Sequence, residues 1–286
     1  MRRAALVFAA LLAACGPNAR MVKTAKDGAA IGTVKLSWSN VHVVFGTHPL
    51  IVDAGATGEF AELVEGLRLL GAPIGPIRCA VITHGHADHA GTARVLQLSG
   101  VKIIAGAGDV DRTWRGVHGP HHPTGVFARI LKWFLPETYR PFVADVLVTD
   151  RYDLAPCGIE GEVVATPGHT PGSVVVLVAH GTIALAGDLF RGGLVFTTSP
   201  AEHFYQDDLK RDHAQIQMLI ARGVKWFVLG HGGPISAAAI RGRFQLEQLA
   251  ARNPAKNRGR FQLEQLAAPN PAIVRDQREP LARPMR

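Results

Sequence analysis

The strongest chemical signal in the sequence is a compact cluster of possible metal ligands, His84-x-His86-x-Asp88-His89. Imidazole and carboxylate groups are the ligands that Zn²⁺ and related divalent metals favour. The cluster follows the apolar run 79–82, which predicts a buried strand. Alternate residues at a strand end point the same way, so His84 and His86 can face one metal ion while Asp88 and His89 face a second. Histidines that only fill a core do not gather in this way.

Four further short segments accompany this cluster along the chain. They read Ile-Val-Asp-Ala-Gly at 51–55, Pro-Gly-His-Thr-Pro-Gly-Ser at 167–173, Ala-Gly-Asp at 186–188 and Gly-His-Gly at 230–232. Together with the cluster, in this order, they resemble the motifs of the metallo-β-lactamase superfamily, and the likeness extends from about residue 34 to residue 233. Each short segment is weak by itself, whereas the complete series is specific.

The resemblance implies a centre for two divalent metal ions, zinc in the first place, with iron or manganese as alternatives. It assigns His84, His86 and His169 to site one, Asp88, His89 and His231 to site two, Asp188 to a bridge between them, and Asp53 to orienting a ligand from behind. Two metals that share a carboxylate can hold a bridging hydroxide, which attacks a carbonyl or phosphoryl centre. Asp88 would orient that hydroxide and carry a proton to the leaving group, so we assign it the catalytic role.

The bridging aspartate indicates which branch of the family the sequence resembles. True metallo-β-lactamases usually have Cys or Ser near the place of Asp188, whereas glyoxalase II-like and lactonase-like members have Asp. We therefore expect a zinc hydrolase that opens a lactone, ester or thioester. Two alternatives stay open: a metallo-β-lactamase that hydrolyses β-lactam antibiotics, and a non-hydrolytic iron-dependent oxidoreductase or metal-binding module of the same fold.

Three residues after the bridge are candidates for substrate contact. Phe190 and Arg191 stand where the quorum-quenching lactonases carry a Tyr shortly after the bridging Asp. Tyr205 could serve in its place from the next loop, or be a surface residue beside His203. Arg191 could meet an anionic substrate group, or pair with Asp207 or its neighbour.

The hydrophobic pattern predicts an α/β fold. Segment 34–45 alternates like a β-hairpin around residues 39–40, residues 57–70 have helical spacing, and a helix is expected from about 88 to 98. Runs of strands with helices between them predict an αββα sandwich of two mixed β-sheets flanked by helices. Residues 111–143, rich in Trp, Phe and Pro, resemble an insertion that could cap the site, and we expect its histidines at 118, 121 and 122 to lie in a solvated loop.

The two ends of the chain carry separate signals. Arg2 and Arg3 precede a short apolar run that ends Leu-Ala-Ala-Cys at Cys15, which resembles the lipobox of bacterial lipoproteins. We expect a signal peptide over 1–15, a tether over 16–32 and a catalytic domain over 33–251. Segment 241–251 recurs at 258–268, so 252–286 should hold a duplicated helix and a basic disordered tail. The lipid on Cys15 would place the protein on the periplasmic face of the outer membrane of a Gram-negative bacterium.

Composition limits the possible partners. The chain of 286 residues is 47% hydrophobic and 19% charged, which suits a packed core, and its net charge of +8 is scattered apart from the C-terminus. Export and the absence of an added nucleic-acid domain argue against nucleic-acid substrates, so we expect a small molecule. The sequence does not indicate an oligomeric state. Export would permit a disulfide between Cys79 and Cys157, but we expect two unpaired thiols, because a strand-interior Cys usually serves packing.

Overall fold

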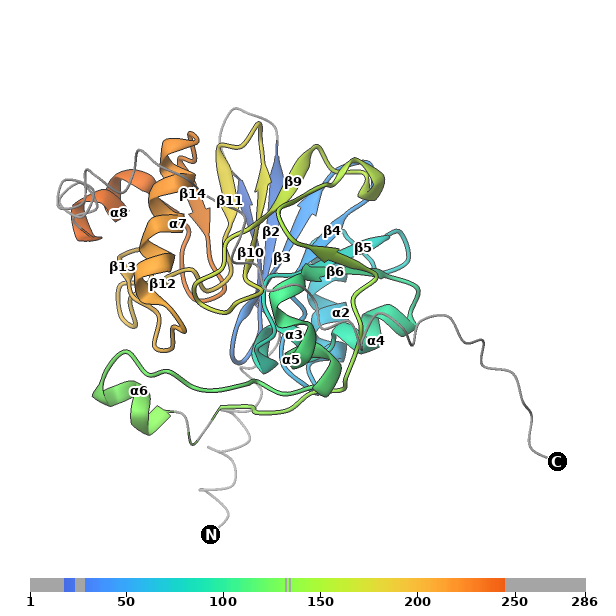
Figure 1. Ribbon diagram of the computed structural model, residues 1–286. Coiled ribbons are helices and arrows are strands. Elements are labelled where there is room, and N and C mark those ends of the chain that lie inside the picture. Colours follow the sequence, from blue (N-terminus) through green and yellow to red (C-terminus); the bar gives the residue numbers. More distant parts are fainter. Residues whose placement is uncertain (1–17, 24–28, 132, 134, 245–286) are drawn as a thin grey trace, which may run out of the picture. The chain divides into compact units, whose positions relative to one another are not determined.

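The computed structural model describes residues 18–23, 29–131, 133 and 135–244 (Figure 1). The chain divides into a unit that ends at Phe244 and a second unit, Gln245–Arg286. The predicted signal peptide with Cys15, and the predicted tail over 252–286, lie outside the described residues. Among the residues that are described, no helix has the length and apolar character needed to cross a bilayer.

The first sheet has seven strands in chain order and is mixed. Its strands are β1 (Asn18–Lys23), β2 (Ala30–Lys35), β3 (Asn40–Phe45), β4 (Leu50–Val52), β5 (Cys79–Ile82), β6 (Lys102–Gly106) and β7 (Val146–Val148). The first four strands pair antiparallel, whereas β4 to β7 pair parallel. Parallel neighbours need crossover connections, and helices supply most of them.

The second sheet has six strands in the order β15-β14-β11-β10-β9-β8. Its strands are β8 (Arg151–Asp153), β9 (Gly161–Ala165), β10 (Val174–Val178), β11 (Ile183–Leu185), β14 (Trp226–Val228) and β15 (Ile235–Ser236). Only β11 and β14 run parallel in it. A separate small ribbon joins β12 (Arg191–Gly192) to β13 (Pro200–Ala201).

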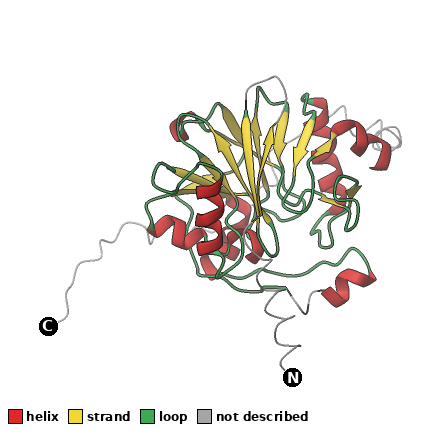
Figure 2. Cartoon of the chain, turned by 180° about the vertical axis from the view of Figure 1, so that it is seen from behind, coloured by secondary structure: helices red, strands yellow, loops and turns green. Residues whose placement is uncertain are grey.

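Helices cover the outer sides of the two sheets, so the strands fill the middle of the fold (Figure 2). They are α2 (Phe60–Leu69), α3 (Ala87–Ala90), α4 (Ala93–Leu98), α5 (Val110–Arg115), α6 (Val126–Leu131), α7 (Leu209–Ala221) and α8 (Ala237–Phe244), with short 3-10 turns η1 (Ala107–Asp109) and η3 (Ala155–Cys157). This confirms the predicted αββα sandwich of two mixed sheets.

Two hydrophobic cores result from the alternation of side chains along the strands. In β5, Cys79 and Val81 join the core that includes residues of both sheets, whereas Ala80 and Ile82 join the core under the helices, with Leu63 and Leu67 of α2. Every residue of β5 is buried. The strand that leads into the histidine cluster is therefore fixed on both faces, which holds the loop after it in place.

The structure corrects three expectations. Part of the predicted tether over 16–32 is sheet, because β1 and the start of β2 pair by backbone hydrogen bonds that need no strong apolar pattern. The single helix expected over 88–98 is two helices, α3 and α4, separated at Gly91 and Thr92. The expectation of free thiols is wrong: Cys79 and Cys157 form a disulfide with a Cα–Cα distance of 5.7 Å.

Candidate metal centre

The predicted ligands come from the ends of strands in both sheets. His84 and His86 lie in the loop after β5, and Asp88 and His89 lie in the short helix α3. The other three follow strands of the second sheet: His169 lies between β9 and β10, Asp188 follows β11, and His231 follows β14. Strand ends of two packed sheets meet at one edge, which explains how residues far apart in the sequence reach one place. All seven predicted ligands are brought together.

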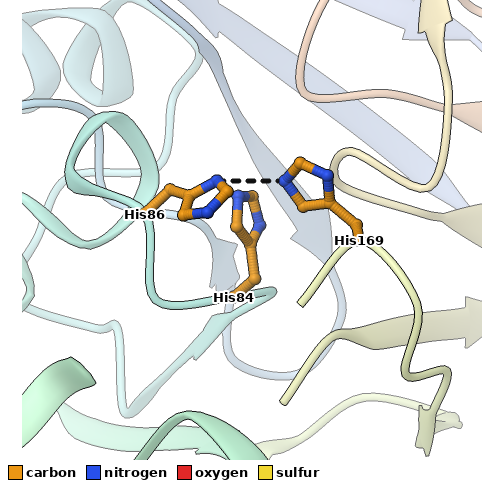
Figure 3. A group of neighbouring side chains, drawn as sticks. All are labelled: His84, His86 and His169. Atoms are coloured by element: carbon orange, nitrogen blue, oxygen red, sulfur yellow. Dashed lines mark hydrogen bonds between the residues drawn. The ribbon is translucent and has the colours of Figure 1, made fainter. Parts of the chain in front are cut away.

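The three histidines of the predicted site one form a tight group (Figure 3). His86 Nδ1 lies 3.0 Å from His169 Nε2, and the ring centroids of His84 and His169 are 4.5 Å apart. The carboxylate of Asp188 approaches the same group, with Oδ2 at 3.8 Å from His84 Nε2 and 3.7 Å from His169 Nε2. These spacings suit atoms that share a metal ion at about 2 Å each.

The predicted site two also adjoins Asp188. Asp88 Oδ2 is 3.6 Å from His89 Nε2 and 3.3 Å from His231 Nε2. Asp188 reaches this group as well, with Oδ1 at 3.4 Å from His89 Nε2 and Oδ2 at 3.2 Å from His231 Nε2. One carboxylate therefore faces both groups of ligands, as a bridging residue must.

In the first group, burial and neighbouring charges keep the histidine rings in the neutral state that binds a metal ion. Burial, together with the neighbouring imidazoles, lowers the pKa of His84 and His86 far below its ordinary value. Burial also lowers the pKa of His169 to about 3. These rings are neutral at pH 7, and a neutral imidazole has the lone pair that a metal needs.

The second group has the opposite balance. Burial alone would lower the pKa of His231, but the carboxylates of Asp188 and Asp88 raise it to about 9. Burial alone would raise the pKa of Asp88, but His89 and His231 hold it below its usual range. The carboxylates on this side carry negative charge, which a bound divalent cation would neutralise.

Two buried atoms in the centre support a metal directly. His84 Nε2 and Asp188 Oδ1 are buried and have no hydrogen-bond partner. Unsatisfied buried polar atoms are costly and rare in folded proteins. Both atoms point to places where other ligand atoms converge, so the donor set fits a pair of divalent metal ions.

Asp53 supports the centre from behind. Its Oδ2 accepts from His89 Nδ1 at 2.8 Å, and its Oδ1 accepts from both the backbone N and the Oγ1 of Thr83 at 2.8 Å. The bond to Nδ1 leaves Nε2 of His89 to face the centre. Such contacts behind a ligand fix its tautomer and orientation.

Several supporting residues carried no signal in the sequence. Asp109 accepts from the backbone N of Gly85 at 2.7 Å and from Thr170 Oγ1 at 2.6 Å, so it joins the loops that carry His84 and His169. Gln206 Oε1 accepts from His169 Nδ1 at 2.7 Å. A lone Asp at a helix start, or a lone Gln in a loop, indicates nothing before the fold brings its partners near.

The histidines of the insertion are not all solvated as expected. His118 is 4% exposed and its ring stacks on His86 with centroids 3.8 Å apart. His121 stacks on His118 in turn, at 4.2 Å. His122 does reach solvent, and its Nδ1 lies 3.1 Å from Asp207 Oδ1. The insertion is thus packed against the metal centre rather than held apart from it.

The predicted substrate contacts differ in position. Phe190 is 1% exposed and packs on Phe227, so it belongs to the core and does not face the site. Tyr205 lines the pocket, but its hydroxyl donates to the backbone O of Ala128 at 2.6 Å, which anchors α6. Arg191 also lines the pocket, with its guanidinium 3.9 Å from the ring centre of Phe204.

A pocket of about 250 Å³ opens onto the centre. Metal-ligand candidates His86, Asp88, Asp188 and His231 lie at it, and Arg191 is the one Arg or Lys side chain among its described lining residues. Its apolar walls include the side chains of Trp38, Leu131, Leu135, Leu194 and Phe204. Phe127 of α6 and Phe196, in the loop between β12 and β13, are 56% and 73% exposed.

The chain is similar to several known proteins. It is 30% identical over 152 residues to the hydroxyacylglutathione hydrolase GloC of Haemophilus influenzae, a match that covers 52% of this chain and 65% of that protein. It is 26% identical over 199 residues to the metallo-beta-lactamase domain-containing protein 1 of Xenopus laevis, covering 68% of this chain and 71% of that one.

Solved structures share the fold. A metallo-beta-lactamase family protein from Thermus thermophilus superposes with a TM-score of 0.55 at 18% identity, covering 83% of this chain and 81% of that one. The DIM-1 metallo-beta-lactamase gives 0.53 at 20% identity, covering 82% and 99%. The model of the metallo-beta-lactamase superfamily matches residues 38–231, the span that contains every predicted ligand. The chain therefore belongs to the metallo-beta-lactamase superfamily.

Proposed function

We propose that the protein is a zinc-dependent hydrolase with two metal ions, which opens a lactone, ester or thioester. The observation that carries the proposal is the place of Asp188, whose carboxylate lies within 3.8 Å of ligand atoms in both groups. When bound, the metals would activate water and stabilise the negative charge that develops on the carbonyl oxygen.

The residues of the chain have separable tasks in this reaction. His84, His86 and His169 would hold one metal ion, and Asp88, His89 and His231 the other, with Asp188 shared. The carboxylate of Asp88 is 12% exposed at the pocket, whereas that of Asp188 is 1% exposed. Asp88 is therefore the carboxylate that can take a proton from the attacking water and pass it to the leaving group.

The pocket favours a substrate with an apolar acyl part. Leu131, Leu135 and Leu194 line it, and burying methylene groups against such walls favours binding by about 0.8 kcal/mol each. Arg191 can donate to a carbonyl or carboxylate of the substrate, because none of its described contacts is an ion pair: it stacks on Phe204 and donates to the backbone O of Gly192. A thioester agrees with the name of the Haemophilus influenzae relative, a hydroxyacylglutathione hydrolase.

We also propose export and attachment to a membrane through a lipid on Cys15, with the protein on the periplasmic face of an outer membrane. The lipobox-like sequence is one support. The disulfide between Cys79 and Cys157 is a second, because disulfides persist in oxidising compartments and are rare in the cytosol. Labelling with a radioactive or alkyne palmitate tests the proposal: incorporation should disappear in Cys15→Ser, and equal incorporation in both forms would contradict it.

The activity is tested with the zinc-loaded full chain against four substrate classes. These are an acyl-homoserine lactone, an aryl ester, an acyl-glutathione thioester and a cephalosporin, each followed by acid release. We expect turnover of one or more of the first three, lost in the His84→Ala, Asp88→Ala double variant. Turnover of the cephalosporin alone would replace the proposal by β-lactam hydrolysis. No hydrolysis of any of the four substrates, with two metal ions bound, would contradict the proposed function.

A further inference from the structure

His203 lies at the metal centre although no motif includes it. It stands in the loop between β13 and α7, is 6% exposed, and has its ring centroid 4.8 Å from that of His169 and 5.2 Å from that of His231. Its Nε2 lies 3.0 Å from Asp188 Oδ2, which is closer than any of the four predicted ligand histidines that approach this carboxylate. The sequence suggested only that Tyr205 could lie beside it.

The contacts of the ring allow a tautomer in which Nε2 donates to Asp188. An ionised carboxylate can only accept hydrogen bonds, so Nε2 of His203 carries the hydrogen that it donates to Asp188. In the neutral ring Nδ1 then accepts, and the backbone N of Tyr205 donates to it at 3.4 Å. Both nitrogens are satisfied in this arrangement. In the other tautomer Nδ1 donates to the backbone O of Tyr205 at 3.3 Å, and Nε2 carries no hydrogen. The ligand atoms of His169, Asp188 and His203 also lie close enough together to hold a metal ion, so a role of Nε2 as a ligand is the alternative to this bond.

The loop that carries His203 is itself held by the insertion. Thr124 Oγ1 donates to the backbone O of His203 at 2.8 Å, and the backbone N of Thr124 donates to the backbone O of Phe204 at 2.9 Å. Pro123 and Tyr205 form an isolated β-bridge beside these bonds. The position of His203 is therefore set by a segment that contributes no predicted ligand.

We propose that His203 is a positioning residue that holds the carboxylate of Asp188 in the orientation needed to serve both metal ions. The proposal rests on the two-metal centre of the proposed function. A carboxylate attached by one rotatable bond could turn toward either group of ligands, whose atoms lie 3.2–3.8 Å from it. The hydrogen bond from His203 removes that freedom. Loss of the bond should therefore weaken the binding of the second metal ion, which depends on the shared carboxylate, more than the binding of the first.

Calorimetric titration of the metal-free full chain with Zn²⁺ tests the role without measuring hydrolysis. The wild-type chain should bind two equivalents. In His203→Ala we expect the second equivalent to bind at least 10-fold more weakly, with the first within about 3-fold of wild type, in line with the effect of contacts behind metal ligands. His203→Gln keeps an N–H donor near the place of Nε2 and should recover most of the loss. His213→Ala, a histidine outside the pocket lining, is the matched control.

Thr124→Val provides a second variant that leaves the imidazole in place and removes one anchor of its loop. It should shift the second equivalent in the same direction by a smaller factor. Circular dichroism of the metal-free forms checks that each variant is folded, and if His203→Ala is not, Thr124→Val and His203→Gln carry the test.

Three results would overturn the proposal. The first is two equivalents bound by His203→Ala as tightly as by wild type. The second is an equal loss in His203→Ala and His203→Gln together with fewer histidine ligands by X-ray absorption, which would make His203 a ligand itself. The third is a wild-type chain that takes up one equivalent. The first two results leave the hydrolase proposal intact. Conversely, if zinc binding follows the expected pattern but no substrate is hydrolysed, the hydrolase proposal fails and the role of His203 stands.

Discussion

The carboxylate of Asp53 lies 2.8 Å from Nδ1 of His89, and both side chains are fully buried. Asp53 adopts a left-handed backbone conformation with φ of 69°, which Asp and Asn tolerate better than other residues with side chains. The residue therefore meets two demands, a turn directly after β4 and an acceptor behind a metal ligand. Its other oxygen accepts two bonds from Thr83, so the carboxylate has no free side on which to rotate.

Asp53→Asn keeps the residue's role in the turn and removes one of its two carboxylate acceptors. The amide keeps the volume and the backbone preference, but its NH₂ group faces either His89 or Thr83, where a donor is already present. We expect zinc affinity at the second site to fall by about 10- to 100-fold, and the free energy of unfolding of the metal-free chain to fall by about 1–3 kcal/mol. Zinc titration and urea unfolding measure the two effects, and wild-type affinity in the variant would contradict the assigned role.

Asp212 of α7 should make stability depend on pH. Burial raises its pKa from the usual 3.8 to about 9, and the carboxylates of Asp208, Asp207 and Asp188 add to the rise. The folded state keeps a proton that the unfolded chain releases, so between pH 4 and 9 the free energy of unfolding falls as pH rises, by at most about 1.4 kcal/mol per pH unit. Asp212→Asn removes this term.

Urea unfolding of the metal-free chain at pH 5, 6.5 and 8 measures the effect of Asp212. The variant should gain stability relative to wild type at each step to higher pH, because it has no proton to lose. Asp208→Asn, at the N-cap of the same helix, should show no such gain, because Asp212 is still present and the amide oxygen of Asn still accepts the cap bond from the backbone N of Arg211. A constant difference between wild type and Asp212→Asn over this range would show that Asp212 is ionised in the folded state.

The disulfide should contribute strongly to stability. Cys79 and Cys157 are both buried and close a loop across 78 residues. The chain-entropy model gives about 4–5 kcal/mol for a loop of this length. The double variant Cys79→Ala, Cys157→Ala should lose free energy of unfolding on this scale, as should the wild-type chain in strong reductant. Matching urea midpoints of oxidised and reduced wild type would refute a stabilising role.

The acyl pocket predicts a dependence on chain length. Leu131 lines the pocket, whereas Val126 begins the same helix, is 74% exposed and does not line it. Leu131→Ser should raise KM for octanoyl esters by about 10-fold, the equivalent of about 1.4 kcal/mol, with little change for acetyl esters and in kcat. Val126→Ser is the control and should leave both substrates unaffected. Equal effects on short and long acyl chains would place the acyl group elsewhere.

The sequence was sufficient to predict the two-sheet fold and to select residues that the structure brings together, because both depend on local pattern. A run such as 79–82 is apolar at every position, and the cluster after it needs no distant partner to stand out. The order of motifs supplied the rest. Strand β1 pairs through its backbone and has no apolar pattern that would predict a strand, so the predicted tether was too long.

The misses share a physical reason. Asp109 bonds to Gly85, 24 residues away, and to Thr170, 61 residues away, and Cys79 meets Cys157 only after the two sheets pack. Such partners are set by tertiary structure, and sequence alone does not determine cysteine connectivity. The burial of His118 and the place of His203 beside Asp188 depend in the same way on how the insertion folds back.

The order in which the ligand candidates occur along the chain bears on how the protein is made. His231 follows its neighbour His89 by 142 residues, and it comes from the strand end of β14 in the other sheet. During synthesis, a chain that has emerged only as far as Asp188 has every residue of site one but lacks the last histidine of site two. Metal that binds the native state alone stabilises it by mass action. In the proposed two-metal protein, uptake of the second ion would require a chain made at least as far as His231 and β14 packed in place. Chains cut before His231 would lack that stabilisation and would be more open to proteolysis.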